Sequence, residues 1–365
     1  MKGLYVHIPF CLRKCRYCSF VSYSGQMDKA EEYAAAVVRE LQQYPKYEVG
    51  TIYFGGGTPT VVCPAVLQRI LEAAFEHYMV SSDAEITIEA NPATVTAKSL
   101  AAYREMGINR ISIGAQSFVK DELLFLGRAH TPADTEAAVQ FARQAGFSNL
   151  SLDLIFGLPG QTAAAVEYSL KRIAALKPEH VSCYALSIEE GTPLYEAAGQ
   201  GEFVPLDGDA VAELYEMVCA YLRSAGYEQY EISNFSLPDY ASRHNCNYWR
   251  CGEYIGAGAG ASGYLEGARY HHPPGLNAYL AGAPREVEEV LGQADKQSEM
   301  MILGLRLVKE GVSVSQFRER FGEDVFDVFG KQLEKHKKFI KQKGDVLILE
   351  PEGYYVSNAI FTDFL

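Results

Sequence analysis

The sequence predicts an α/β fold: an open, partial barrel of six strand–helix units, followed by a small helical domain. Three observations lead to this prediction. Short apolar stretches alternate six times with stretches of helical periodicity before residue 225, which is typical of βαβ units and a parallel sheet. Glycine and polar residues gather where these strands end, and from about residue 294 the pattern turns helical. Six units are too few for a closed eight-stranded barrel, and a doubly wound sheet is the alternative.

The expected strands are rich in β-branched and aromatic residues and occupy residues 3–9, 51–60, 84–92, 110–118, 149–162 and 180–188. Helices are expected where apolar residues recur at helical spacing, at residues 28–44, 64–78, 96–106, 131–145, 163–175 and 208–224. Because the strands of such a sheet are parallel, their carboxyl ends meet at one edge. The polar residues at those ends should therefore form a single site.

The remainder of the chain divides into two further parts. Residues 226–293 are rich in Gly, Tyr and Asn and poor in helical period, so we expect an extension of the sheet edge with a functional loop. Residues 294–365 form the last part, and the first, 1–225, is the barrel. In the last part we expect helices at 295–308, 315–321 and 325–343 and a hairpin at 345–357, which together are winged-helix-like.

The composition is that of a globular protein with ample core: of 365 residues, 48% are hydrophobic and 22% are charged. The net charge of −13 disfavours nonspecific binding to nucleic acid and to anionic membranes. The sequence contains no signal-peptide pattern and no apolar stretch of the ~20 residues that a membrane span needs. We expect a soluble cytoplasmic protein whose eight cysteines form no disulfide framework.

The strongest chemical signal is a cysteine loop near the amino terminus. In HIPFCLRKCRYCSF (7–20), Cys11, Cys15 and Cys18 have the spacing C-x3-C-x2-C. Three thiolates can hold three irons of a cubane cluster and leave the fourth iron open to a small molecule. A structural zinc site is the alternative, and it would need a fourth ligand such as His7. His7 lies in an expected strand, and no second cysteine pair follows at zinc-ribbon spacing.

With Tyr17 before the last cysteine, this pattern resembles the signature of radical S-adenosylmethionine (SAM) enzymes. The resemblance implies a partial (βα)6 barrel, a 4Fe–4S cluster on the three cysteines and SAM on the open iron. In that superfamily the reduced cluster cleaves SAM to a 5′-deoxyadenosyl radical. The segment GGGTPT (55–60) is similar to the one that binds the methionyl amine in these enzymes, and its glycines allow close approach of the backbone to a ligand.

A narrower resemblance covers nearly the whole chain. YVHIPFCLRKCRYC, GGGTPT, SIGAQSF, LGRAH, LSLDLIFGLPGQT and YEISNF together resemble the oxygen-independent coproporphyrinogen III oxidase group, which includes the HemW heme chaperones. The resemblance assigns Tyr5, Gly56 and Glu89 to the cluster-bound SAM. The positions at which the oxidases bind a second SAM are Tyr17, Gly57, Thr58, Gln116, Arg128 and Asp153, and whether this chain binds one is open. Asp153 also stands out physically, because an acid within an apolar strand needs a partner or a ligand.

Two further features resemble the chaperones more than the oxidases. The oxidases carry another cysteine two residues after the third ligand, where this chain has Phe20, and they carry a long segment before the loop, where this chain has ten residues. The absence of that cysteine argues against porphyrin decarboxylation.

The segment HNCNYW (244–249) is similar to the HNxxYW motif of the chaperones. The resemblance implies heme binding, with His244 as an axial ligand and Tyr248 and Trp249 as flat faces. Cys246 and Cys251 are alternative heme ligands or small buried residues. One departure is Ser262, where relatives commonly have a histidine.

The sequence thus favours a heme chaperone that carries a 4Fe–4S cluster and SAM and delivers heme to heme-requiring proteins, for example respiratory ones. No catalytic residue is assigned, and whether the protein is an enzyme stays open. The alternatives are coproporphyrinogen III oxidase or another radical SAM reaction on a tetrapyrrole, such as methyl transfer or ring opening. A homodimer and a peripheral membrane association also stay open. A DNA-binding role for the last part is disfavoured, because residues 295–365 hold 11 basic and 12 acidic residues.

Overall fold

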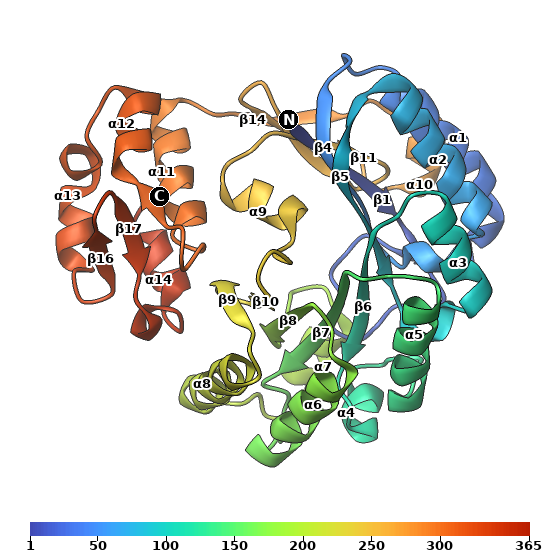
Figure 1. Cartoon of the computed structure of the whole chain (residues 1–365), viewed down its shortest axis with the longest axis horizontal. Coiled ribbons are helices and arrows are strands. Elements are labelled where there is room, and N and C mark those ends of the chain that lie inside the picture. The colour runs from blue at the N-terminus through green and yellow to red at the C-terminus, as the bar shows by residue number, and fades with distance from the viewer.

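The computed structural model describes residues 1–365 and is built on one twelve-stranded sheet. At its centre six strands run parallel to one another (Figure 1). They are β1 (Lys2–Ile8), β4 (Glu48–Gly56), β5 (Met79–Ala90), β6 (Arg110–Gln116), β7 (Leu150–Phe156) and β8 (His180–Ala185). The six strands expected from the sequence are therefore confirmed.

Helices follow the outer side of this curved sheet, as Figure 1 shows. They are α1 (Ala30–Leu41), α2 (Pro64–His77), α3 (Ala97–Glu105), α5 (Pro132–Gln144), α6 (Ala163–Leu176) and α8 (Gly208–Ser224). An open barrel with helices on its outer side fits the predicted fold class, and the doubly wound alternative would have placed helices on both faces. Two short helices, α4 (Lys120–Phe125) and α7 (Pro193–Gly199), were not expected. Each is too short for a clear period of 3.6 residues.

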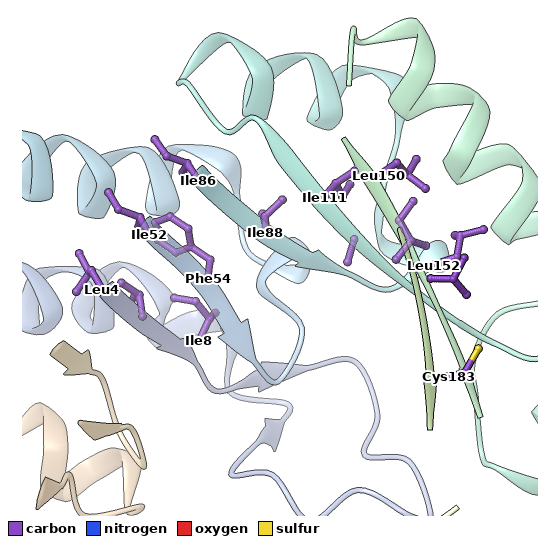
Figure 2. Close-up of a cluster of buried hydrophobic side chains, with 14 of the residues drawn as sticks. Leu4, Ile8, Ile52, Phe54, Ile86, Ile88, Ile111, Leu150, Leu152 and Cys183 are labelled. Atoms are coloured by element: carbon purple, nitrogen blue, oxygen red, sulfur yellow. The ribbon is translucent and has the colours of Figure 1, made fainter. Parts of the chain in front are cut away.

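Side chains of the central strands alternate between an outer and an inner face. The outer face is apolar and packs against the helices (Figure 2), with Leu4, Ile8, Ile52, Phe54, Ile86, Ile88, Ile111, Leu150, Leu152 and Cys183 at its centre. Tyr53 and Asp153 lie between such residues in sequence, so they point to the inner face. Strand register then places Glu89 beside Ser112 and Asp153 beside Ser182. The fold thus gathers the polar residues inside the barrel.

The sheet is extended at both edges. Beyond β1 come β11 (Tyr254–Ala257), β12 (Ser262–Leu265), β13 (Ala268–His271) and β14 (Glu286–Val290), which confirms the expected edge extension. Beyond β8 come β10 (Asn234–Ser236) and β9 (Glu228–Glu231). Two helices interrupt this region, α9 (Arg243–Trp249) and α10 (Leu276–Leu280), and neither was expected. In Figure 1, α9 lies between the barrel and the carboxyl-terminal domain.

The carboxyl-terminal domain combines helices with a small antiparallel sheet. It consists of α11 (Gln293–Gly304), β15 (Val312–Ser313), α12 (Val314–Phe321), α13 (Val325–Lys335), β16 (Ile340–Lys343), β17 (Val346–Leu349) and α14 (Ser357–Thr362). Two expectations were wrong here. The helix expected to reach residue 343 ends at Lys335, and the hairpin lies at β16–β17 rather than at 345–357. Gly344, with a φ of 63°, allows the tight turn that joins the two strands.

Short 3-10 helices complete the chain at Met27–Lys29, Pro59–Val61, Pro92–Thr94 and Pro351–Gly353. The carboxyl-terminal domain is attached to the barrel by a backbone hydrogen bond from Val308 to Tyr230 (3.1 Å) and by the ion pair of Arg306 with the buried Glu231 (3.2 Å). None of the helices has the length and apolarity needed to cross a bilayer.

Candidate functional site

A cavity of about 460 Å³ opens inside the barrel at the carboxyl ends of the parallel strands. This is the edge at which the sequence predicted a site. Its lining includes every residue assigned to the cluster or to SAM except Tyr5: Cys11, Cys15, Tyr17, Cys18, Gly56, Gly57, Thr58, Glu89, Gln116, Arg128 and Asp153. Tyr5 lies beside this group, where its hydroxyl meets Nδ1 of His7 (3.0 Å) and its ring stacks on Tyr53.

The cysteine loop is held at both ends by a short parallel pair, β2 (Phe10–Cys11) and β3 (Tyr23–Ser24). Within the loop, Cys11 Sγ lies 3.4 Å from Thr58 Oγ1, and an Arg128 guanidinium nitrogen lies 3.5 Å from Cys15 Sγ. None of the three thiols is in a disulfide. Burial raises the pKa of Cys11 and of Cys18, so loading iron onto the loop must release protons.

These residues fit a cubane cluster better than a single metal ion. No group of three or more His, Cys, Asp or Glu side chains converges as the ligands of one ion would, whereas a cubane takes each thiolate on a different iron. Both nitrogens of His7 are engaged, Nε2 with the carbonyl of Val21 (2.8 Å) and Nδ1 with Tyr5. His7 is therefore not free as the fourth ligand that a zinc site would need.

The glycines of the GGGTPT segment let strand β4 end directly against the cysteine loop. Gly57 and Thr58 donate backbone hydrogen bonds to the carbonyls of Ile8 and Phe10, at 3.0 and 2.8 Å. A Cβ on Gly56, whose φ is 107°, would come within 2.5 Å of the His7 ring. The sequence suggested glycines for approach to a ligand, and the structure shows that they also bring the two halves of the site together.

A half-buried carboxyl group lies on the inner wall of the cavity. Glu89 accepts a hydrogen bond from the hydroxyl of Tyr53 (2.8 Å) and another from the backbone nitrogen of Gly56 (3.2 Å). Burial raises the pKa of Glu89 to about 7, against the effect of these two donors. The carboxyl group therefore changes charge near neutral pH, where a bound amine or hydroxyl would favour the ionised form.

Gln116 and Arg128 line the same cavity. Gln116 has a φ of 63° at the end of β6, and such left-handed backbone in a residue other than glycine is found at ligand sites. Arg128 donates to the carbonyl of Gly114 (2.9 Å) and also lies 3.5 Å from the Tyr17 hydroxyl. The guanidinium thus connects strand β6 to the cysteine loop, next to Cys15.

Deeper in the barrel, Asp153 lies close to a cation that the sequence analysis missed. Asp153 accepts from Ser112 Oγ (3.1 Å), and burial raises its pKa. Arg110 is only 2% exposed and lines the same cavity, where its charge favours the ionised form of Asp153. Strand alternation could have revealed Arg110 and Ser112. Every second residue of β6 points to the inner face, and both residues line the cavity.

The HNCNYW segment lies in helix α9, and its side chains reach two separate regions of the structure: the barrel and the carboxyl-terminal domain. His244 is 1% exposed, with Nδ1 bonded to Thr51 Oγ1 (2.8 Å) and Nε2 to the Tyr248 hydroxyl (2.7 Å). Burial lowers the pKa of His244 to about 3, so the ring is neutral. Both nitrogens are engaged, and an axial role for His244 would require one of these bonds to break. Asn245, by contrast, reaches the barrel cavity.

Trp249, at the other end of α9, lies outside the barrel. The Arg306 guanidinium stacks over its ring at 4.4 Å from the centroid. Its indole nitrogen is buried and has no hydrogen-bond partner. The three residues to which the sequence analysis assigned heme are thus not gathered in one cavity: His244 and Tyr248 bond to each other, and Trp249 faces the carboxyl-terminal domain.

Comparison with known proteins agrees with this arrangement. Residues 5–173 match the model of the radical SAM superfamily, and residues 291–356 match that of the HemN C-terminal domain. The chain is 36% identical to the heme chaperone HemW of Lactococcus lactis, over 99% of this chain and 96% of that protein. It is also 36% identical to HemW of Bacillus subtilis, over 100% of this chain and 99% of that protein.

The fold itself matches that of a solved oxidase. The structure of coproporphyrinogen III oxidase (HemN) from Escherichia coli superposes with a TM-score of 0.85, over 99% of this chain and 89% of that one, at 23% identity. At this identity the match establishes the fold alone. The full-length matches at higher identity narrow the assignment: the chain belongs to the radical SAM superfamily, whose cofactors are a 4Fe–4S cluster and SAM, and within it to the HemW family.

Proposed function

We propose that this protein is a heme chaperone, which binds heme and passes it to heme-requiring proteins in the cytoplasm or at the membrane surface. The observation that carries the proposal is the full-length similarity to two proteins named heme chaperone HemW, with coverage of at least 96% of each. Respiratory enzymes are the recipients that we propose. A homodimer belongs to the same proposal, and light scattering of the purified protein tests it.

We further propose the cofactor contacts from the lining of the barrel cavity. Cys11, Cys15 and Cys18 hold the cluster, which when bound supplies an electron and an open iron for SAM. Arg128 places a positive charge beside Cys15, at 3.5 Å, and so favours the thiolate form of the loop. Tyr5, Gly56 and Glu89 serve SAM, and the remaining polar residues of the cavity orient it.

The carboxylate of Glu89 is the group that recognises the amine or a ribose hydroxyl in this proposal. Tyr53 and Gly56 fix its position with hydrogen bonds of 2.8 and 3.2 Å. A second SAM would use the cavity wall formed by Tyr17, Gln116, Arg128 and Asp153, all of which line it. Equilibrium dialysis with radiolabelled SAM gives the number of molecules bound per chain.

Coproporphyrinogen III oxidase is the alternative function, because the same fold occurs in that enzyme. Phe20 argues against it. This residue lines the cavity and is 64% exposed. The oxidases that the chain resembles carry another cysteine at this position. Another radical SAM reaction on a tetrapyrrole is the remaining alternative.

One experiment separates the chaperone from the oxidase. The cluster-loaded protein is incubated without oxygen with SAM, a reductant and coproporphyrinogen III, and the products are resolved by chromatography. The chaperone proposal expects no protoporphyrinogen IX, together with stoichiometric binding of heme in a separate titration. Turnover to protoporphyrinogen IX, or a failure to bind heme, would reject the proposal.

We also propose that residues 1–225, 226–293 and 294–365 act as three parts of the protein: the barrel, the sheet extension and the carboxyl-terminal domain. The match of residues 291–356 to the HemN C-terminal domain supports the last boundary. Limited proteolysis tests it, with cleavage expected near residues 283–293.

A further inference from the structure

Arg110 is a buried cation that lines the barrel cavity and has no partner within the protein. The residue is 2% exposed, its Nε is buried without a hydrogen-bond partner, and its guanidinium forms no ion pair. A charge that is taken out of water needs an opposite charge or a full set of hydrogen bonds. Arg306, for comparison, pairs with the buried Glu231 at 3.2 Å. An anion from outside the chain would supply the compensation that the protein does not give to Arg110.

The carboxyl groups that share the cavity with Arg110 have other partners. Asp153 accepts a hydrogen bond from a serine hydroxyl at 3.1 Å, and Glu89 accepts one from a tyrosine hydroxyl at 2.8 Å. Burial raises the pKa of both groups, which reduces the negative charge that they place beside Arg110. The third carboxyl group of the lining, Glu189, is exposed. The cavity therefore contains no carboxylate that is committed to Arg110.

A second donor reaches the cavity from helix α9. Asn245 is half-buried and lines the cavity, and its side-chain amide forms no hydrogen bond within the protein. Burial lowers the pKa of the preceding His244, and the charge of Arg110 adds to this effect, so the guanidinium acts on the same region. His244 is bonded to Thr51 and Tyr248 and so holds α9 against the barrel. A guanidinium and a primary amide at one end of a cavity are suitable donors for a carboxylate.

This end of the cavity lies away from the cysteine loop. Arg110 begins β6 and Gln116 ends it, so about 20 Å separates their backbones, from the rise per residue of a strand. The other cations that line the cavity belong to the cysteine loop or lie beside it: Arg13, Lys14 and Arg128. Arg110 and Asn245 are thus separate from the groups that hold the cluster.

We propose that Arg110 and Asn245 bind the carboxylate of a small organic acid other than SAM at the deep end of the barrel cavity. The planar guanidinium donates two N–H groups to the two carboxylate oxygens, and the amide of Asn245 donates a third hydrogen bond. One guanidinium beside two acids accommodates a single negative charge, which favours a carboxylate over a phosphate dianion. The inference gives a role to the first asparagine of the HNCNYW segment and does not depend on heme binding.

The test uses the full-length, cluster-loaded protein without oxygen, with acetate as the probe. Thermal unfolding is followed by circular dichroism in acetate and in chloride at equal ionic strength, which separates binding from screening. The midpoint temperature should rise with acetate and level off, because a ligand that binds only the folded state stabilises it. Arg110→Gln should raise the dissociation constant from this curve at least about tenfold, and Asn245→Ala about threefold. Arg69→Gln, at an exposed position on α2, is the matched control and should leave the curve unchanged.

Arg110→Gln also separates a binding role from a structural one. Removing an unpaired buried charge should leave the midpoint temperature in chloride unchanged or higher, whereas Arg306→Gln, which breaks a buried ion pair, should lower it. A clear loss of stability in Arg110→Gln would show that Arg110 compensates the acids of the cavity, and the site would fail. Asn245→Asp places a carboxylate at this end of the cavity, so its response to acetate should disappear. An undiminished response in Asn245→Asp would overturn the site, even if Arg110→Gln does not fold.

A second measurement separates the organic acid from SAM, which carries a carboxylate of its own. Equilibrium dialysis with radiolabelled SAM is repeated at saturating acetate, and the amount of SAM bound should stay the same. Displacement of SAM by acetate would assign Arg110 to SAM and reject a separate ligand. No saturable effect of acetate on the unmodified protein would reject the site altogether. None of these measurements involves heme, so their failure and the failure of the chaperone proposal are distinguishable.

Discussion

Replacing Glu89 by Gln tests the electrostatics of the barrel cavity. Burial raises the pKa of Glu89 from 4.5 to about 7. Between these two pH values, Glu89 is therefore protonated in the folded protein and ionised in the unfolded chain. The favourable contribution of Glu89 is complete below pH 4.5 and is lost as the pH rises through 7. At 1.36 kcal/mol per unit, the largest penalty is about 3 kcal/mol above pH 7. Hydration from the cavity reduces it to about 1–2 kcal/mol.

A glutamine keeps an oxygen that can accept from Tyr53 and Gly56 but carries no charge. We therefore expect Glu89→Gln to raise the free energy of unfolding by about 1–2 kcal/mol at pH 8 and to change it little at pH 4.5. Urea denaturation of the full-length protein, followed by circular dichroism, measures both. Glu105→Gln, at an exposed position on α3, is the control. A variant that is destabilised at pH 8 would refute the reasoning, because the hydrogen bonds would then outweigh the cost of burial.

Three other substitutions test separate features. Gly56→Ala should lower the free energy of unfolding by about 2 kcal/mol or more and reduce the iron content. The added Cβ would lie 2.5 Å from His7 at a residue whose φ is 107°. Gly146→Ala is the control: its φ is 88° but open space surrounds it, so it should cost about 1 kcal/mol. Arg306→Ala should lower the free energy of unfolding by about 3 kcal/mol, because it leaves the fully buried Glu231 without its ion-pair partner. The control is Lys309→Ala, which breaks an exposed ion pair and should cost less than about 1 kcal/mol. His244→Phe should cost about 1–3 kcal/mol in the free energy of unfolding by orphaning Thr51 and Tyr248, which bond to its two ring nitrogens; a heme titration of the same variant shows whether His244 also serves as the iron ligand that the sequence predicts.

Much of the cluster site could be predicted from the sequence because its signals are local. Cys11, Cys15 and Cys18 lie within eight residues, and the glycines at 55–57 directly follow a strand. Six parallel strands bring their ends to one edge, so residues far apart in the chain meet there. The cavity lining accordingly contains all of the assigned cluster and SAM residues except Tyr5.

Three other features, namely the burial of Arg110, the environment of His244 and the position of the last hairpin, depend on packing between distant segments of the chain. Strand alternation indicates which face of the sheet Arg110 occupies, but its burial there, with only 2% exposed, depends on the neighbouring strands of the barrel. His244 looks like a free loop histidine until Thr51 and Tyr248 are seen on its two nitrogens. The hairpin at the end of the chain was misplaced because the lysine-rich stretch before Gly344 has the composition of an exposed helix. Pairing with Leu347 and Leu349 makes it a strand instead.

Transfer of heme to a recipient tests the central claim most directly. The full-length, cluster-loaded protein is saturated with heme, freed of excess by gel filtration and mixed without oxygen with the apo form of a b-type heme enzyme. The proposed function predicts that the enzyme gains activity and that heme leaves the chaperone in equal amount, faster than spontaneous dissociation measured with a heme scavenger. Transfer no faster than that dissociation, or heme that stays bound, would contradict the account.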